Sequence, residues 1–166
     1  MSQQQTVRIT TTETTNSSAL IINSGYLSTI PGLLKVSQFI LGCICVGIIA
    51  YHFNDRHIST TSELFYYLMC VTFLICTTIL LVSCLISWST GGIISKTIYE
   101  LIYHCVAAIL IIIASVALIV VINDRSVSHI YRPIYKELLA AGVIGLINGL
   151  LYVLSTFYAR RSYKGI

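Results

Sequence analysis

Charged residues are the scarcest class in this sequence. Asp, Glu, Lys and Arg make up 10% of its 166 residues, whereas hydrophobic residues make up 56%; soluble domains carry about 25% charged residues. From Leu64 to Ser95 the chain has no formal charge, and this run is longer than the roughly 20 apolar residues that cross the hydrocarbon core of a bilayer. The sequence therefore predicts an integral membrane protein and excludes a soluble fold.

Apolar stretches of spanning length occur at four places, separated by short polar segments. They predict an all-α membrane protein, a four-transmembrane-helix bundle with short loops. The polar residues before the first span have too few apolar groups to order themselves, so we expect a flexible cytosolic tail there. The expected boundaries are 1–29 for this tail, 30–158 for the transmembrane domain, with spans at about 30–51, 64–86, 98–122 and 138–158, and 159–166 for a basic cytosolic C-terminal tail.

Basic residues favour cytosolic termini under the positive-inside rule. The proposed inner set is Arg8, Lys35, Lys96, Arg160, Arg161 and Lys164, against Arg56, Arg125, Arg132 and Lys136 in the outer loops. The last three of the inner set follow the fourth span directly. They are candidate contacts for anionic lipid headgroups, or they serve only to fix the orientation of the chain.

Cysteines are absent from both outer loops, which excludes loop disulfides of the kind that staple an extracellular domain. All six fall inside the spans or at their edges. Cys43 and Cys45 are one residue apart and point to different sides of a helix, which argues against a metal or redox pair. We interpret most of the cysteines as small packing residues. Cys84 and Cys105 lie near the cytosolic face and are candidate acceptors of palmitate.

Small and polar residues line one face of each span. Helices in lipid associate through close backbone approach at small residues and through interhelical hydrogen bonds, so these faces should form the contacts of the bundle; a homodimer surface is the alternative. The expected contact residues are Gln38 and Gly42 in the first span, Phe65, Met69, Thr72, Cys76 and Ser83 in the second, Ala107, Ala114 and Ser115 in the third, and Ala141, Gly145, Asn148, Gly149 and Tyr152 in the fourth.

Glu100 and His104 begin the contact face of the third span and are the most function-like pair in the chain. Ionisable groups in a membrane helix can relay protons or ions. Both residues also lie within two turns of the cytosolic end, where they can reach headgroups or pair with Lys35 or Lys96. Interfacial anchoring and a relay are therefore the two interpretations.

Conventional enzyme signatures are absent from the sequence: it has no Gly-x-Ser-x-Gly elbow, no phosphate-binding Gly-rich loop and no His-Glu-x-x-His. We therefore expect no catalytic residues, no cofactor and no metal. His52 and His57 could form a metal site with Asp55, but their loose spacing favours solvated loop residues. The basic residues form no long patch interleaved with aromatics, so nucleic acid is not an expected partner.

Three motifs follow one another along the chain: Pro31-Gly32-Leu33-Leu34-Lys35 with Gln38, Leu41 and Gly42; Tyr99-Glu100-Leu101-Ile102-Tyr103-His104 with the small residues that follow; and Ala140-Ala141-Gly142-Val143-Ile144-Gly145 with Leu151, Tyr152 and Thr156. In their order and spacing, over about 27–163, they resemble the MARVEL-domain family of four-span membrane proteins. The short, cysteine-free loops resemble its chemokine-like-factor, plasmolipin and myelin-and-lymphocyte branches. Where many relatives carry an acidic residue after the Tyr of the fourth span, this chain has Ser155.

The resemblance implies cytosolic termini and a location in the plasma membrane, in vesicles or in both. It implies a non-enzymatic organiser that acts in membrane apposition, vesicle trafficking, lipid-domain or cell-junction organisation, or cell fusion. The implied partners are membrane lipids and other membrane proteins, with a homo-oligomer left open. The alternative from the residues themselves is a small transporter or channel that uses Glu100 and His104.

Overall fold

A computed structural model describes residues 24–55, 60–86, 97–124 and 134–165 of the chain. Within these ranges the protein is helical and has no strand. The elements are a short 3-10 helix, η1 (Ser24–Ser28), and the α-helices α1 (Ile30–Asp55), α2 (Thr61–Ile86), α4 (Ile98–Asn123) and α6 (Tyr135–Lys164). Each α-helix is long and apolar enough to cross a bilayer, so the predicted bundle of four transmembrane helices is confirmed for the described residues.

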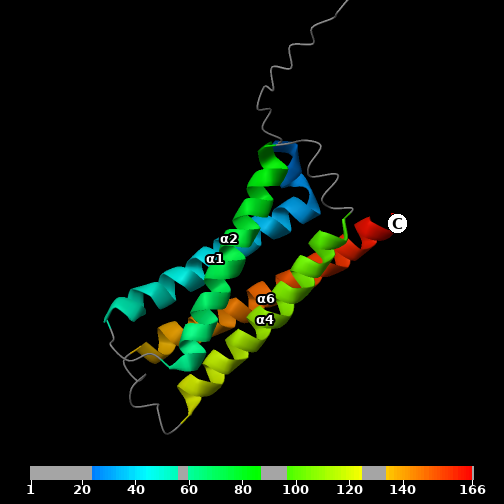
Figure 1. Cartoon of the computed structure of the whole chain (residues 1–166). Helices are drawn as coiled ribbons and strands as arrows, with labels where there is room; N and C mark the ends of the chain where they lie inside the picture. Colours follow the sequence, from blue (N-terminus) through cyan, green and yellow to red (C-terminus); the bar gives the residue numbers. More distant parts are fainter. Residues whose placement is uncertain (1–23, 56–59, 87–96, 125–133, 166) are drawn as a thin grey trace, which may run out of the picture.

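The α-helices alternate in direction and form a ring in the order α1, α2, α4 and α6 (Figure 1). Neighbours in the ring pack together, most extensively α4 with α6, whereas α1 and α4 face each other across it. The first turns of α1 and α4 and the last turns of α2 and α6 share one end of the bundle (Figure 1). We call this the basic end, because α6 carries Arg160, Arg161 and Lys164 there.

Glycines on α6 allow its close approach to α4. A Cβ atom added at Gly142 would lie 2.7 Å from Cγ1 of Ile119, and one at Gly149 would lie 2.6 Å from Cγ1 of Ile112. Both distances are far inside van der Waals contact, so a larger residue would require the isoleucine side chains or the helices to shift. This is the close backbone approach through which helices associate in lipid.

The predicted contact residues of the first, third and fourth spans are all buried: Gln38, Gly42, Ala107, Ala114, Ser115, Ala141, Gly145, Asn148, Gly149 and Tyr152. In the second span, the buried residues lie one position further along the chain than the predicted contact residues. Its buried face includes Tyr66, Cys70, Phe73 and Thr77, whereas Thr72 is exposed. The composition of α2 misled the assignment, because small and polar residues occur on several of its sides.

Helix α6 is longer than expected. The sequence suggested an end at Tyr158 and a basic tail at 159–166, but the helix continues to Lys164 and has 30 residues, or about 45 Å of length. It ends at Gly165, whose φ of 69° gives the left-handed conformation typical of a residue that closes a helix. The basic residues therefore lie on a rigid helical extension of the fourth span.

The end of the expected N-terminal tail is also ordered, because η1 folds back onto the start of α1. Thr29 Oγ1 donates to the carbonyl oxygen of Tyr26 at 2.7 Å and accepts from the backbone N–H of Gly32 at 3.2 Å. The carbonyl group of Tyr26 occupies the position that a Cβ of residue 32 would need, so only glycine permits this turn. Residues 1–23 of the expected tail, including the Asn16 sequon, lie outside the described residues.

Candidate functional site

Lys35 and Glu100 form an ion pair at the basic end of the bundle core. Lys35 Nζ, on α1, donates to Glu100 Oε1, on α4. The two residues are 2% and 4% exposed, so each charge is withdrawn from solvent and compensated by the other. His104 Nε2 lies 3.4 Å from the same Glu100 oxygen. Lys35, Glu100 and His104 thus form one buried cluster.

Local sequence explains how this cluster is positioned. Glu100 occupies the first turn of α4, where the positive end of the helix dipole favours an acidic side chain. His104 follows four residues later and therefore lies on the same helix face. Lys35 lies near the start of α1, at the same end of the bundle (Figure 1), and its long side chain extends across the ring to α4.

Residues of η1 and α2 close the cluster from the end of the bundle. The ring centroid of Tyr26 lies 5.7 Å from Lys35 Nζ, a distance suited to a cation–π contact. Burial raises the pKa of the Tyr26 hydroxyl, and the neighbouring Cys84 and Glu100 side chains raise it further. The phenol therefore stays protonated at neutral pH, and its ring rather than its charge meets the lysine.

Hydrogen bonds between helices continue from the cluster into the core. Gln38 Nε2 on α1 donates to Ser155 Oγ on α6 at 2.8 Å. The Thr77 hydroxyl on α2 shares hydrogen bonds with the Tyr103 hydroxyl on α4 at 2.7 Å and with the Tyr152 hydroxyl on α6 at 2.5 Å. These bonds join α1, α2, α4 and α6 through side chains alone.

The imidazole of His104 lies between the Lys35–Glu100 ion pair and the hydrogen-bonded hydroxyls of Tyr103 and Tyr152. Its ring centroid lies 5.0 Å from that of Tyr103 and 5.9 Å from that of Tyr152. Neither ring nitrogen has a hydrogen-bond partner among the described residues, and the same holds for Gln38 Oε1 and Asn148 Oδ1. The polar groups are thus packed closely by rings and only partly satisfied by hydrogen bonds.

A second set of interhelical contacts lies further from the basic end of the bundle. The Tyr66 hydroxyl on α2 donates to the carbonyl oxygen of Ala141 on α6 at 2.5 Å. Cys45 Sγ on α1 approaches the same carbonyl oxygen at 3.8 Å, and Cys45, Tyr66 and Cys70 belong to one cluster of buried side chains. These residues fasten α1 and α2 to the first half of α6.

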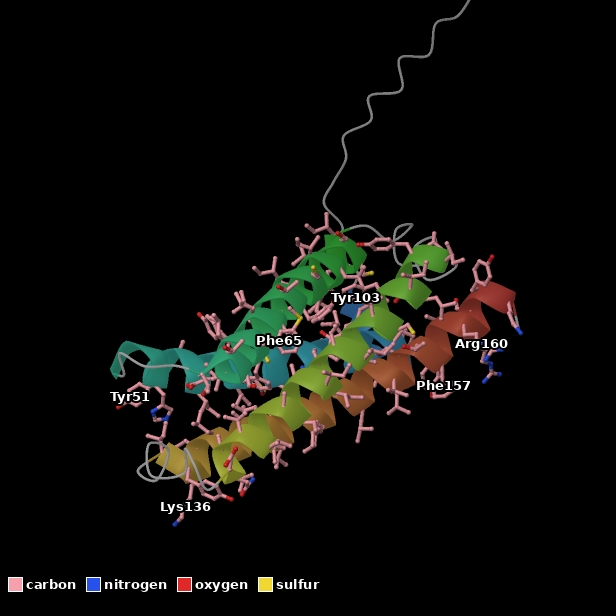
Figure 2. The ribbon with its side chains drawn as sticks, turned by 60° about the horizontal axis from the view of Figure 1, so that its bottom comes forward. Tyr51, Phe65, Tyr103, Lys136, Phe157 and Arg160 are labelled. Carbon is pink, nitrogen blue, oxygen red and sulfur yellow. The ribbon has the colours of Figure 1, made fainter. Side chains whose placement is uncertain are left out.

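Of the candidate lipid-contact and palmitate-acceptor residues, some are exposed and one is buried. Arg160, Arg161, Lys164 and Cys105 are exposed, and Figure 2 shows Arg160 at the opposite end of the molecule from Lys136 and Tyr51. Cys84, one of the two candidate acceptors of palmitate, is 2% exposed. Helices α1 and η1 pack against α2, and the burial of the Cys84 thiol weighs against this assignment.

The interpretation of His52 as a solvated loop residue is also corrected. His52 is a buried residue of α1 and not a solvated loop residue, since the helix continues beyond the expected end at Tyr51. His57 and Lys96 lie outside the described residues. Among the residues that the structure describes, no group of three or more His, Cys, Asp and Glu is placed to hold a metal ion.

Sequence reasoning missed several core hydroxyls, among them those of Tyr66, Thr77 and Tyr103. The spacing of Tyr66, Cys70, Phe73 and Thr77 is that of one helix face and could have indicated α2's buried side. Tyr103 lies at the edge of the buried stripe of α4, and nothing in the sequence indicates that its hydroxyl reaches Thr77.

Comparison with known proteins identifies one family. The profile of the membrane-associating domain named MARVEL matches residues 26–158. This range begins at the tyrosine of η1 and ends within α6, so it includes every member of the buried cluster. No curated protein and no solved structure matches the chain.

Proposed function

Because the chain belongs to the MARVEL family of membrane-associating domains, we propose that this multi-pass membrane protein is a non-enzymatic organiser of membranes. It acts through lateral contacts with lipids and with other membrane proteins. The processes it serves are membrane apposition, vesicle trafficking, lipid-domain or cell-junction organisation, or cell fusion.

The distribution of polar and apolar side chains between the core and the surface supports this proposal. Buried charges and hydroxyls are turned toward one another inside the bundle, whereas large apolar side chains are exposed on α1, α2, α4 and α6 alike, including Ile40, Ile79, Val120 and Leu150. Lipid tails are as apolar as these residues. The surface that the described residues offer within the bilayer is thus suited to lateral contact.

The ion pair also weighs against the transporter interpretation of Glu100 and His104. A relay group must exchange its proton or ion, but Glu100 is held by Lys35 and enclosed at 4% exposure. Opening the pair would leave two uncompensated charges in a region of low dielectric, which costs several kcal/mol per ion. The cluster is better suited to holding α1 and α4 together.

Flux measurements on liposomes that contain only this protein test the proposal. We expect no proton- or ion-dependent flux above that of empty liposomes. A flux that disappears in Glu100→Gln, while the variant remains folded, would establish the transporter instead. Proximity labelling from a tag on the N-terminal tail would then identify the proteins that the organiser meets in cells.

We also propose that both termini are cytosolic, in the plasma membrane, in vesicles or in both. The exposed basic residues at the end of α6 support this orientation through the positive-inside rule. Asn16 begins an Asn-x-Ser sequon, which is glycosylated only if the N-terminus enters the secretory lumen. A glycosidase-sensitive mass shift that is lost in Asn16→Gln would reverse the orientation.

A further inference from the structure

The outer side of α6 carries an apolar stripe that runs into a group of cations. Leu150, Leu154 and Phe157 are exposed, and at 100° per residue they share one face of the helix. Arg161 and Lys164 continue that face, with Arg160 at its edge, and all three are exposed. In Figure 2, Phe157 and Arg160 follow each other along this side of α6.

The dimensions of the stripe match those of one phospholipid leaflet. Leu150 and Arg161 are separated by about 16 Å along the helix axis, and half of the hydrocarbon core is about 15 Å thick. An acyl chain laid on Leu150, Leu154 and Phe157 therefore brings its headgroup to the level of the cations. The 62% exposure of the Phe157 ring leaves it open to such a chain.

Charge at the basic end is of one sign on the described surface. Glu100 belongs to this end, but it is buried and neutralised by Lys35. The other acidic residues with described side chains lie at the opposite end of the bundle: Glu63 and Glu137 in the first turns of α2 and α6, and Asp124 directly after α4. Arg160 and Lys164 thus meet no exposed carboxylate among the described side chains at their own end.

We propose that this face of α6 is a binding site for an anionic phospholipid. Its cations hold the headgroup phosphate and carboxylate oxygens, and Leu150, Leu154 and Phe157 hold an acyl chain. The helical extension to Lys164 fixes the cations relative to the apolar stripe, which an unstructured basic tail would not do. The site requires membrane insertion but not the organiser role, so the two proposals can fail separately.

Lipid retention measured by native mass spectrometry tests the site. The full chain is purified in detergent and offered phosphatidylserine or phosphatidylcholine with identical acyl chains. We expect wild type to retain phosphatidylserine preferentially. Each basic residue contributes about fivefold to such binding, so Arg160→Gln combined with Lys164→Gln should lower the preference about 25-fold. Arg161 makes a contact of its own within the protein and is left unchanged.

Lys136→Gln is the matched control, because it removes an exposed cation from the opposite end of the same helix. The preference should survive this change. An equal loss in Lys136→Gln and in the double variant, or no loss in either, overturns the proposal. Circular dichroism establishes that each variant keeps its helices.

Two further measurements separate the remaining explanations. Inorganic phosphate in excess should compete poorly, because it has no acyl chain for Phe157, and Phe157→Ala should lower retention of both phospholipids. Effective competition by phosphate would instead assign a site for free anions. If the double variant fails to fold, the salt dependence of the wild-type protein tests the proposal. Raising salt should reduce retention of phosphatidylserine and not of phosphatidylcholine. A preference for phosphatidylserine that does not respond to salt contradicts the proposal.

Discussion

Lys35 of α1 pairs with Glu100 of α4, two helices that face each other across the ring. Close packing joins each helix to its neighbours in the ring, whereas this ion pair joins two helices that are not neighbours. It lies beneath Tyr26 and beside His104, at the basic end of the bundle core. The pair therefore fixes the distance between α1 and α4 at the basic end.

We expect removal of either partner to destabilise the bundle strongly. Lys35→Met leaves the Glu100 carboxylate buried without its cation, and Glu100→Gln leaves the ammonium unpaired; breaking a buried pair from one side costs about 3–5 kcal/mol. The double variant should recover most of this loss, because no uncompensated charge remains. Unfolding of the four proteins in detergent micelles gives the coupling free energy. Additive losses would show that the pair does not act as a unit.

Gly145 should tolerate no side chain. A Cβ atom there would lie 2.5 Å from Ser115 Oγ and 2.6 Å from the Tyr66 hydroxyl, and the Tyr66 ring is fully buried. We expect Gly145→Ala to cost about 1–3 kcal/mol, as overpacking does in tight cores.

Gly47 provides the matched control for Gly145, because a Cβ atom added there meets nothing within 4 Å. Gly47→Ala should be neutral or slightly stabilising, since alanine favours helix by up to about 1 kcal/mol over glycine. Thermal unfolding of both variants in one detergent checks the comparison. Equal stability of the two would mean that α4 and α6 are less closely packed than described.

Thr77 should matter more than either tyrosine that it contacts. Tyr152→Phe removes one hydrogen bond and leaves Thr77 bonded to Tyr103, at a cost of about 0.6 kcal/mol, the average for such bonds between membrane helices. Thr77→Val removes both bonds and leaves two hydroxyls without this partner. We expect its cost to be at least twice that of Tyr152→Phe, and a smaller cost would show that the tyrosine hydroxyls find other partners.

The contact between Cys45 and Cys70 predicts that a short bifunctional thiol reagent joins α1 to α2. In a chain that keeps only these two cysteines, dibromobimane should react with both thiols and become fluorescent, because both belong to the same cluster of buried side chains between the helices. A chain that keeps only Cys43 and Cys70 is the control, since Cys43 is exposed on another side of α1. Fluorescence in the control alone would mean that the face of α1 is wrongly assigned.

The sequence by itself determined the class of the protein and most of its contact faces. Uncharged runs of spanning length can form only membrane helices here, so the bundle followed from composition. The burial of Gly145 and Ser115 followed from helical spacing, because small residues gather where helices approach closely. Even the pair of Glu100 and His104 was recognisable, since two ionisable groups on one face of an apolar helix need a partner.

Tertiary structure decided what those residues meet. Lys35 and Lys96 were equally available to Glu100 in sequence, and the diagonal placement of α1 and α4 brings Lys35 to it. The buried side of α2 and the burial of Cys84 depended likewise on which helices cover them, because nearly every side of α2 is apolar enough to face either lipid or protein. Periodicity can show that a helix has a contact face, but only the neighbouring helices determine which side it is and which partners it finds.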